Sequence, residues 1–349
     1  MAAVRSAPRV LLLCGGRSAE HAVSLASARS VLAAARDLDI TPLVVGRDGR
    51  LLSPAASAAA LSSPPPTVAG GDDRQAATDD AATLAALPRA YDVVFPLLHG
   101  PYGEDGRVQG LLDVIGLPYV GSGVLGSAVG MDKLTMKAVF AAHALPQVAY
   151  LAVTRHDWTS DPGAVAARLA PLGHRLFVKP ANLGSSIGIS RVTDRDALAA
   201  ALDTAFAHDR RVIVEAAADA ARELEVAVLG NEAPEASPVG EITYDTDYYD
   251  YATKYTDGRA ELRIPAAVPR DVAAAAAAMA LTAFRAVDAR GLARVDFFYL
   301  EREGRLLVNE INTMPGFTRH SMYPRLWGAA GLEFGALVGR LVELALEGA

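Results

Sequence analysis

The chain has 349 residues, with 33 Lys or Arg and 40 Asp or Glu, so its formal net charge is −7. At about 100 to 200 residues per domain, this length suggests two or three domains, and a hydrophobic content of 51% can bury a sizeable core. The acidic balance argues against a general nucleic-acid binder, which needs a basic patch, but it allows a local Lys and Arg pocket for a small anion.

The sequence contains one cysteine, Cys14, so no intrachain disulfide is possible, which fits a reducing compartment. Cys14 ends the apolar run Val10–Cys14, which predicts a buried strand thiol rather than a catalytic one. The run is too short for a signal peptide, and no stretch approaches the ~20 apolar residues of a transmembrane helix. We therefore expect a soluble, cytoplasmic protein with no membrane partner.

The beginning of the chain alternates strands with a helix. Val10–Cys14 predicts a strand, residues 15–17 a turn, and the Ala- and Ser-rich stretch from about Ser18 to Ala35 a helix. A second strand is predicted at Thr41–Gly46. This order is typical of a parallel sheet with helical crossovers.

Residues 53–83 interrupt this pattern with a triple proline, a double glycine and many Ala and Ser. They predict a surface insertion that is partly mobile. Tyr91–Pro96 resumes the strand pattern, and Pro118–Val120 is another short extended stretch. Asp132 is suited to cap a helix with two lysines on one face. We expect residues 1–132 to form an N-terminal domain.

The middle of the chain predicts an antiparallel hairpin, because Leu176–Val178 and Ile189–Val192 enclose a Gly- and Ser-rich loop at residues 182–188. A helix at Asp194–Ala207 and a strand at Val212–Glu215 follow. These elements would form a central domain.

We place the central domain at residues 133–220 and a third domain at residues 221–349. The elements predicted in the third domain are a strand at Glu223–Leu229, a helix around the six alanines of residues 273–278, paired strands at Arg294–Leu300 and Leu306–Asn312, and an amphipathic helix at about Leu332–Leu346.

Residues 121–126 match the GxGxxG pattern of dinucleotide-binding proteins, which alone is a weak signal. No Asp or Glu lies about 20 residues later to hold a ribose hydroxyl. We therefore interpret the motif as a glycine-rich loop that enters a helix, and an NAD-dependent dehydrogenase is the less favoured hypothesis. The absence of a Gly-Lys dipeptide excludes a Walker A loop.

The paired strands of the third domain flank a polar turn and give the strongest geometric argument. A hairpin centred on Glu303 places Asp296 directly opposite Glu310. Arg294 and Asn312 lie on the same face, because side chains two residues apart share a face of a strand.

Two carboxylates that face each other across a strand pair lie about 5 Å apart and repel each other. A hard divalent cation would compensate, and the oxygens of Asp296, Glu310 and Asn312 suit magnesium or manganese. The alternative is a solvated polar face on which Arg294 pairs with one acid, and the hairpin alone leaves both readings open. A register shift of one residue would remove the pairing.

The central hairpin favours the metal site. Lys179 ends a strand beside the loop at residues 182–188, whose backbone N–H groups and hydroxyls are suited to phosphate oxygens. Lys133 could add positive charge. Loops of this kind are usually only turns, but together with a lysine and a separate oxygen-ligand metal site this one indicates a nucleoside triphosphate held between two domains.

Nine segments together resemble the D-alanine–D-alanine ligases of the ATP-grasp superfamily, in the family's order and over almost the whole chain. They are Gly15-Gly16-Arg17-Ser18-Ala19-Glu20, Leu98-His99-Gly100, Gly103-Glu104-Asp105-Gly106, Met131-Asp132-Lys133, Val178-Lys179-Pro180, Gly184-Ser185-Ser186-Ile187-Gly188, Lys254-Tyr255, Arg294-Val295-Asp296 and Asn309-Glu310-Ile311-Asn312-Thr313-Met314-Pro315-Gly316.

The resemblance implies an α/β, three-domain ATP-grasp fold in which the second and third domains sandwich ATP. It implies a nucleotide site formed by Lys133, Lys179, Ser185, Ser186, Glu215 on the adenine side, Glu223 at the ribose, and Lys254. It also implies that Asp296, Glu310 and Asn312 bind two Mg²⁺ ions, or Mn²⁺. The chain departs from relatives after Glu215, where it has three alanines, and the segment before Glu223 is one residue longer.

The implied reaction joins two D-alanine molecules for peptidoglycan precursor synthesis. One carboxylate attacks the γ-phosphate of ATP to give an acyl phosphate and ADP, and the amine of the second substrate then displaces phosphate. On the substrate side, the resemblance implies that Glu20 binds the first ammonium with His99 nearby, and that Ser321 binds the second carboxylate. Arg294 and the backbone N–H of Gly316 would stabilise the oxyanion. Ser185 and Tyr255 would bond with Glu20 and close the loop at residues 244–259 over the site, which excludes water.

Other interpretations remain for these residues and for the function. Glu20 could simply favour a helix N-terminus, Ser321 could be a helix cap, and His99 and Tyr255 could be ordinary loop residues. The second substrate could be D-lactate, D-serine or another amino acid, although Lys254-Tyr255 resembles the dipeptide-forming class. A nucleotide-binding protein without turnover is a third hypothesis. The family also suggests a homodimer through the N-terminal domain.

Overall fold

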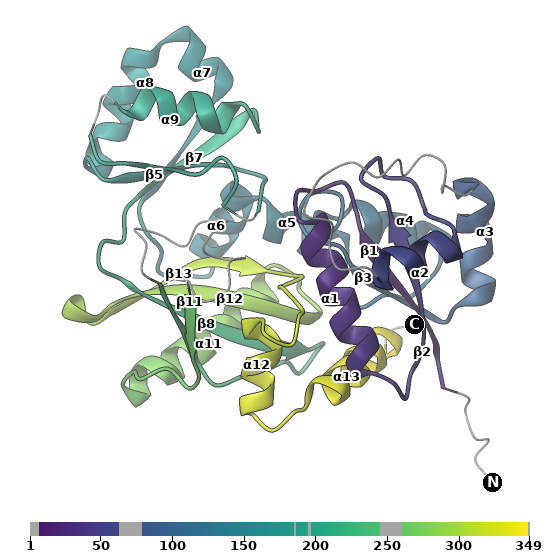
Figure 1. Ribbon diagram of the computed structural model, residues 1–349. Coiled ribbons are helices and arrows are strands. Elements are labelled where there is room, and N and C mark those ends of the chain that lie inside the picture. The colour runs from purple at the N-terminus through teal and green to yellow at the C-terminus, as the bar shows by residue number, and fades with distance from the viewer. Residues whose placement is uncertain (1–6, 63–78, 185, 195–196, 245–259, 348–349) are drawn as a thin grey trace.

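The computed structural model describes residues 7–62, 79–184, 186–194, 197–244 and 260–347. The strands of these residues form three separate sheets, and Figure 1 shows the sheet that contains β5 and β7 standing above the other two.

The N-terminal sheet is parallel, as the sequence predicted, with the order β2–β1–β3. Its strands are β1 (Arg9–Gly15), β2 (Asp39–Val45) and β3 (Val93–Leu97), and the helices of this part are α1 (His21–Ala34), α2 (Pro54–Ser62), α3 (Asp80–Ala90) and α4 (Arg107–Ile115). Cys14 is fully buried in β1, and burial raises the pKa of its thiol to about 12. The prediction of an inert strand thiol is therefore confirmed.

The first part of the segment predicted as a surface insertion is a packed helix. In α2, Leu61 is buried, and the buried Ser57 hydroxyl accepts a hydrogen bond of 3.0 Å from the Val44 N–H of β2. Alanine-rich composition hid this helix, because alanine packs closely without giving a strong hydrophobic periodicity. Residues 63–78 of the predicted insertion lie outside the described residues.

The upper sheet in Figure 1 has the order β4–β7–β5–β6. Its elements are β4 (Tyr150–Thr154), β5 (Leu176–Pro180), β6 (Ser190–Val192) and β7 (Arg211–Ala216), with α7 (Arg155–Ser160), α8 (Pro162–Leu169), a 3₁₀ turn (Ala170–Leu172) and α9 (Ala197–Phe206). The predicted antiparallel pairing of the two strands around the glycine-serine loop is confirmed. β4, α7 and α8 were not predicted from the sequence.

The largest sheet has the order β11–β10–β8–β12–β13, with β9 paired to β8. Its elements are β8 (Arg222–Gly230), β9 (Glu235–Ala236), β10 (Gly240–Tyr244), β11 (Ala260–Arg263), α11 (Arg270–Ala286), β12 (Gly291–Leu300), a 3₁₀ turn (Glu301–Glu303) and β13 (Arg305–Asn312). The buried alanines of α11 pack on one face of this sheet with Phe284. That leaves the opposite face for the polar residues.

Two helices before the upper sheet also contact the largest sheet: α5 (Val124–Met131) and α6 (Lys133–Ala142). Gly123 precedes α5, so the glycine-rich motif is a loop that enters a helix, as interpreted. Gly126 packs closely, since a Cβ there would lie 2.7 Å from the Asp288 carbonyl oxygen. Asp132 caps α6 as predicted, because its carboxylate accepts the Thr135 N–H at 2.9 Å.

The two ends of the chain share one hydrophobic core. Helix α13 (Phe334–Leu346) packs with α1 and β3 and lies below α1 in Figure 1, and α12 (Met322–Ala329) packs with α13 and β8. Phe317 lies at the centre of this core, with its ring centroid 5.5 Å from that of Phe95 and 5.4 Å from that of Phe334. The N-terminal sheet and the segment after β13 are therefore held against each other.

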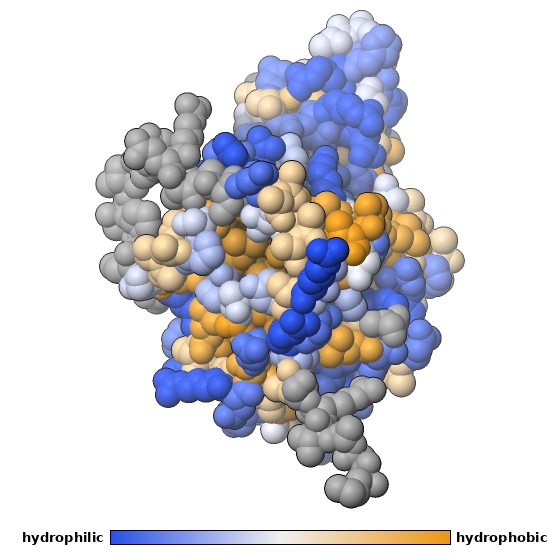
Figure 2. Space-filling view, turned by 90° about the vertical axis from the view of Figure 1, so that its right-hand side faces the viewer, coloured by the Kyte–Doolittle hydropathy of each residue, from blue (hydrophilic) through white to orange (hydrophobic). Residues whose placement is uncertain are grey.

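Figure 2 shows the side of the molecule at the right of Figure 1, where hydrophobic residues lie between hydrophilic ones. Within the described part of the chain, no helix combines the length and the apolar character needed to cross a membrane.

Two glycines of α13 provide a paired test of the packing between chain ends. A Cβ at Gly335 would lie 2.7 Å from the Ala34 carbonyl oxygen of α1, whereas a Cβ at Gly339 would meet nothing within 4 Å. We expect Gly339→Ala to stabilise the protein by about 0.5–1 kcal/mol, because alanine is the better helix former. Gly335→Ala should destabilise it, because the added methyl forces the helices apart. Denaturant unfolding measures both; stabilisation by Gly335→Ala would contradict the packing.

Candidate functional site

The polar residues predicted around a metal site lie on one face of β12 and β13. Along β12 the side chains alternate, with Arg294 and Asp296 half-buried between fully buried neighbours. Across the strand pair, Asp296 faces Glu310 and Arg294 faces Asn312. The predicted register is therefore confirmed at the positions that carry the site.

The predicted register is wrong beyond Asp296. The pairing shifts by one residue, so that Phe297 faces Val308 and Leu300 faces Arg305. Near this β-bulge the Val308 N–H donates instead to the Pro146 carbonyl oxygen at 2.8 Å, in the segment after α6. A bulge places an extra residue in one strand and bends it. Because the shift falls beyond the acids, their pairing is kept.

Arg294 holds the acidic face together. Its guanidinium donates hydrogen bonds of 2.7 Å to each carboxylate oxygen of Asp296 and lies 3.1 Å from the Glu225 carboxylate of β8. Glu225 is buried and faces Asp296 directly from the other neighbouring strand. Three carboxylates therefore lie in a row across β8, β12 and β13, and sequence reasoning missed the first of them.

A group of lysines lies opposite this acidic face. The Lys133 ammonium donates to the Leu183 carbonyl oxygen at 2.7 Å and lies 4.0 Å from the Glu310 carboxylate. This contact links α6, the loop after β5 and β13. The structure thus brings Lys133 close to both the glycine-serine loop and the acidic pair, as the sequence argument required.

Glu215, at the end of β7, lies between two buried lysines. Its carboxylate is 2.6 Å from the Lys179 ammonium and 3.1 Å from that of Lys137. Burial alone would raise the pKa of Glu215, but Lys137 and Lys179 lower it to about 2. Burial opposes the charge of Lys179, yet Glu215, Glu310 and Glu223 raise its pKa above the ordinary value. Glu215 and Lys179 are therefore both charged near neutral pH.

Glu223 lies on β8 and accepts a hydrogen bond of 2.5 Å from the Tyr244 hydroxyl. It belongs to the largest sheet, whereas Glu215 belongs to the upper one. The two residues predicted for the adenine and the ribose thus approach from two different sheets. The remaining predicted residues of the lid and nucleotide site, Ser185, Lys254 and Tyr255, lie outside the described residues.

Glu20 precedes α1 and lies where the N-terminal elements meet the glycine-serine loop. A Cβ at Gly100 would lie 2.7 Å from a Glu20 carboxylate oxygen, and one at Gly184 would lie 3.5 Å from the same atom. Glycine at both positions leaves room for this carboxylate. On the other side of the loop, Ser186 has a positive φ of 57° and is half-buried.

Glu104 is a second buried acid near Glu20 that was not predicted as a site residue. Its carboxylate accepts the Gly100 N–H at 2.7 Å. Burial raises its pKa to about 8, and the charge of Glu20 contributes in the same direction. Nearby, His99 is also buried, and burial lowers its pKa. Near neutral pH this corner holds a protonated carboxyl and an uncharged imidazole.

Gly316 and Ser321 lie in the segment between β13 and α12. Ser321 occupies the position before α12 but makes no side-chain cap bond to that helix. Its hydroxyl instead lies 2.9 Å from the Thr318 hydroxyl and accepts the Thr318 N–H at 3.1 Å. Ser321 is thus the N-cap residue of α12 by position, but its hydroxyl does not cap the helix. A Cβ at Gly316 would lie 3.2 Å from this hydroxyl.

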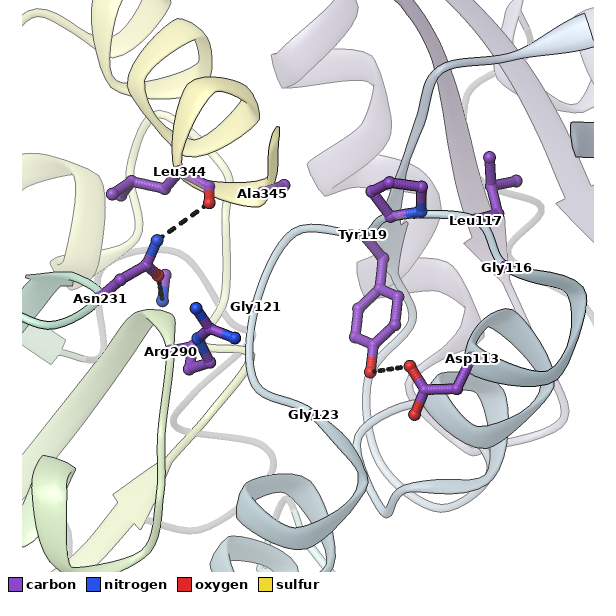
Figure 3. A pocket seen from close by; sticks show the side chains of 12 residues that line it. Asp113, Gly116, Leu117, Tyr119, Gly121, Gly123, Asn231, Arg290, Leu344 and Ala345 are labelled. Carbon is purple, nitrogen blue, oxygen red and sulfur yellow. Dashed lines mark hydrogen bonds between the residues drawn. The ribbon is translucent and has the colours of Figure 1, made fainter. Parts of the chain in front are cut away.

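A separate pocket of about 390 Å³ lies beside the glycine-rich loop of residues 121–126. Figure 3 shows hydrogen bonds of two polar side chains in the pocket: the Tyr119 hydroxyl donates to Asp113 at 2.9 Å, and the Asn231 amide donates to the Leu344 carbonyl at 2.9 Å. It contains none of the predicted site residues, so the acidic face and the lysines remain the candidate site.

Similarity to known proteins extends over almost the whole chain. Family models described as the D-ala D-ala ligase N-terminus and C-terminus match residues 9–122 and 139–343. The chain is 56% identical over 342 residues to the D-alanine–D-alanine ligase of Deinococcus radiodurans, covering 97% of this chain and 98% of that protein.

Two solved structures are similar over almost the whole chain. The D-alanine–D-alanine ligase of Coxiella burnetii superposes with a TM-score of 0.80 at 34% identity, covering 98% of this chain and 95% of that one. The VanG D-Ala:D-Ser ligase of Enterococcus faecalis gives 0.79 at 29% identity, covering 97% and 100%.

The raised pKa of Glu104 predicts that the stability of the protein depends on pH. Between its ordinary pKa of 4.5 and its folded value of about 8, the unfolded chain has lost a proton that the folded chain keeps. The contribution of this group to the free energy of unfolding therefore falls as pH rises through that window. Glu104→Gln should remove this fall. Denaturant unfolding of wild type, Glu104→Gln and the exposed control Glu303→Gln at about pH 5 and pH 8 measures it; an unchanged pH dependence in Glu104→Gln would be inconsistent with a protonated acid.

Proposed function

The chain belongs to the D-alanine–D-alanine ligase family, and from this premise we propose how its own residues perform the reaction. It has the ATP-grasp fold and catalyses the ATP-dependent ligation of two D-alanine molecules to D-alanyl-D-alanine through an acyl phosphate, for peptidoglycan precursor synthesis. The observation that carries the site assignment is the pairing of Asp296 with Glu310 beside Lys133.

The acidic face has the donors that a magnesium site needs. Among the described residues no group of three His, Cys, Asp or Glu is arranged around a metal, but the proposed set has two carboxylates and the amide oxygen of Asn312. Such oxygen donors suit Mg²⁺, with Mn²⁺ as a substitute. We assign two ions to Asp296, Glu310 and Asn312; when bound, they would offset negative charge on the transferring phosphoryl group.

The nucleotide would lie between the upper and the largest sheet. Lys133 and Lys179 supply positive charge for the phosphates, and the half-buried Ser186 lies in the loop beside them. Ser185 and Lys254 would complete this group of phosphate-binding residues. Glu215 would face the adenine, where the charges of Lys137 and Lys179 keep it ionised, and Glu223 would accept from the ribose.

The substrates would lie between the N-terminal elements and the segment after β13. We place the first ammonium on Glu20, near His99, and the second carboxylate on Ser321 at the start of α12. Arg294 and the Gly316 N–H would stabilise the oxyanion of the tetrahedral intermediate. Ser185 and Tyr255 would bond with Glu20 and close the site, because water hydrolyses an acyl phosphate.

Three further proposals concern organisation. We propose domains at residues 1–132, 133–220 and 221–349, supported by the three separate sheets. We also propose a homodimer through the N-terminal domain. Large hydrophobic side chains that are exposed on the described residues support it, and four of the five lie on α4 and α5: Leu111, Val114, Val124 and Leu125. A cytoplasmic location remains a prediction.

A different second substrate is not favoured. The relative that is 56% identical is a D-alanine–D-alanine ligase, whereas the D-Ala:D-Ser ligase is 29% identical. With ATP and D-alanine alone, we expect ADP, phosphate and dipeptide in equal amounts. Chromatography of the products with and without added D-lactate tests this; preferential formation of the D-alanine–D-lactate ester would overturn the substrate assignment.

Glu310→Gln tests the metal site. The substitution keeps the shape but removes a charge from the proposed ligand set, so we expect kcat to fall at least about 100-fold, with the unfolding midpoint nearly unchanged. The control is Glu303→Gln, which changes an exposed acid in the turn of the same hairpin and should keep kcat. Near-normal turnover of Glu310→Gln would remove this residue from the site.

A further inference from the structure

The segment that carries Gly316 is held at two points by N-terminal elements. The His99 Nδ1 lies 3.0 Å from the carbonyl oxygen of Met314. The Phe317 N–H donates to the hydroxyl of Ser27, in α1, at 3.3 Å. These two anchored backbone groups enclose Pro315 and Gly316, so both sides of the proposed oxyanion donor are fixed from outside its own sheet.

Ser27 and His99 also contact each other, with the Ser27 hydroxyl 3.3 Å from His99 Nε2. One arrangement of protons satisfies all three contacts. The Met314 carbonyl can only accept, so Nδ1 carries the proton and Nε2 accepts from the Ser27 hydroxyl. The Ser27 oxygen is then available to accept the Phe317 N–H. An uncharged ring is required, and full burial disfavours the charged form.

The local chain leaves little freedom between the two anchors. Pro315 fixes its own φ near −65°, and the Asn312 amide oxygen accepts the Met314 N–H at 3.0 Å. The direction of the Gly316 N–H therefore depends on where the Met314 carbonyl and the Phe317 N–H are held. A misplacement of about 1 Å in such a donor is enough to lower a catalytic rate about 100-fold.

We propose that Ser27 and His99 act as a positioning pair that aims the Gly316 N–H at the tetrahedral intermediate. Ser27 acts through Phe317 and His99 acts through Met314. The inference rests on the proposed role of Gly316 and goes beyond it by making catalysis in the third domain depend on a serine in the first helix of the chain. It also gives His99 a task other than contact with the substrate.

Ser27→Ala is the direct test, with Ser57→Ala as the matched control. Both serines are fully buried in the N-terminal part, and each hydroxyl accepts one backbone N–H, from Phe317 and from Val44 respectively. Only the first hydrogen bond reaches the segment of Gly316. We expect similar drops in Tm for both variants. Ser27→Ala should lower kcat about 10- to 100-fold with the KM for ATP nearly unchanged, whereas Ser57→Ala should keep kcat.

Two further variants keep the test decisive. Ser27→Cys keeps the unbranched shape of the side chain and fills the position, but its thiol hydrogen-bonds more weakly, so it should fold and show a smaller loss of kcat. Ser27→Ala combined with His99→Gln should be no slower than the slower single variant, because the two residues act as a unit. Equal kcat values for the Ser27 variants and Ser57→Ala, or fully additive losses in the double variant, would overturn the proposal. Absence of dipeptide from the wild type would instead reject the proposed function.

Discussion

The candidate site depends on like charges that lie on neighbouring strands of the largest sheet. Glu225, Asp296 and Glu310 lie in a row across three adjacent strands, and directly opposed like charges destabilise a sheet. One guanidinium, that of Arg294, contacts the first two acids, and the third has a lysine 4.0 Å away. Further positive charge bound at this face would stabilise the row, so the sheet is suited to cations.

On the side of the site opposite the acidic face, positive charges outnumber negative ones. Lys133, Lys137 and Lys179 are all buried, and Glu215 is the acid that pairs with the last two of them. Removing an ammonium group from water is costly unless it is paired. A ligand that contacts both the lysines and the acidic face would therefore carry negative charge beside the lysines and bind cations beside the acids. A triphosphate with divalent metal ions has both properties, and this supports the nucleotide and metal sites that we propose.

The sequence predicted local features more successfully than long-range ones. The pairing of Asp296 with Glu310 followed from the alternation of side chains and the position of the turn. The bulge beyond it could not be predicted, because the Val308 N–H leaves the ladder for a carbonyl oxygen of Pro146, 162 residues earlier in the chain. Glu225 could have been found, since it shares a strand face with Glu223. Helix α2 was hidden by its alanine content.

The role proposed for Ser27 could not be predicted from the sequence, because it depends on long-range contacts. In the sequence it is one serine of an Ala- and Ser-rich helix, and nothing in its local pattern separates it from Ser24 or Ser30. Its partners lie 72 and 290 residues away. They reach it because α13 packs on α1, and because α12 and α13 complete the core that contains Phe317. That shared core holds two parts of the chain together. It makes the N-terminal part a fixed support for the segment after β13, and the upper sheet lies outside this shared core. Few buried hydrophobic residues join the upper sheet to the other two sheets. Among the described residues, all buried members of its hydrophobic cluster lie between positions 153 and 214. Polar contacts join the central and third domains, such as the ammonium of Lys133 with the carboxylate of Glu310 at 4.0 Å, and polar contacts exchange readily with water when two parts separate.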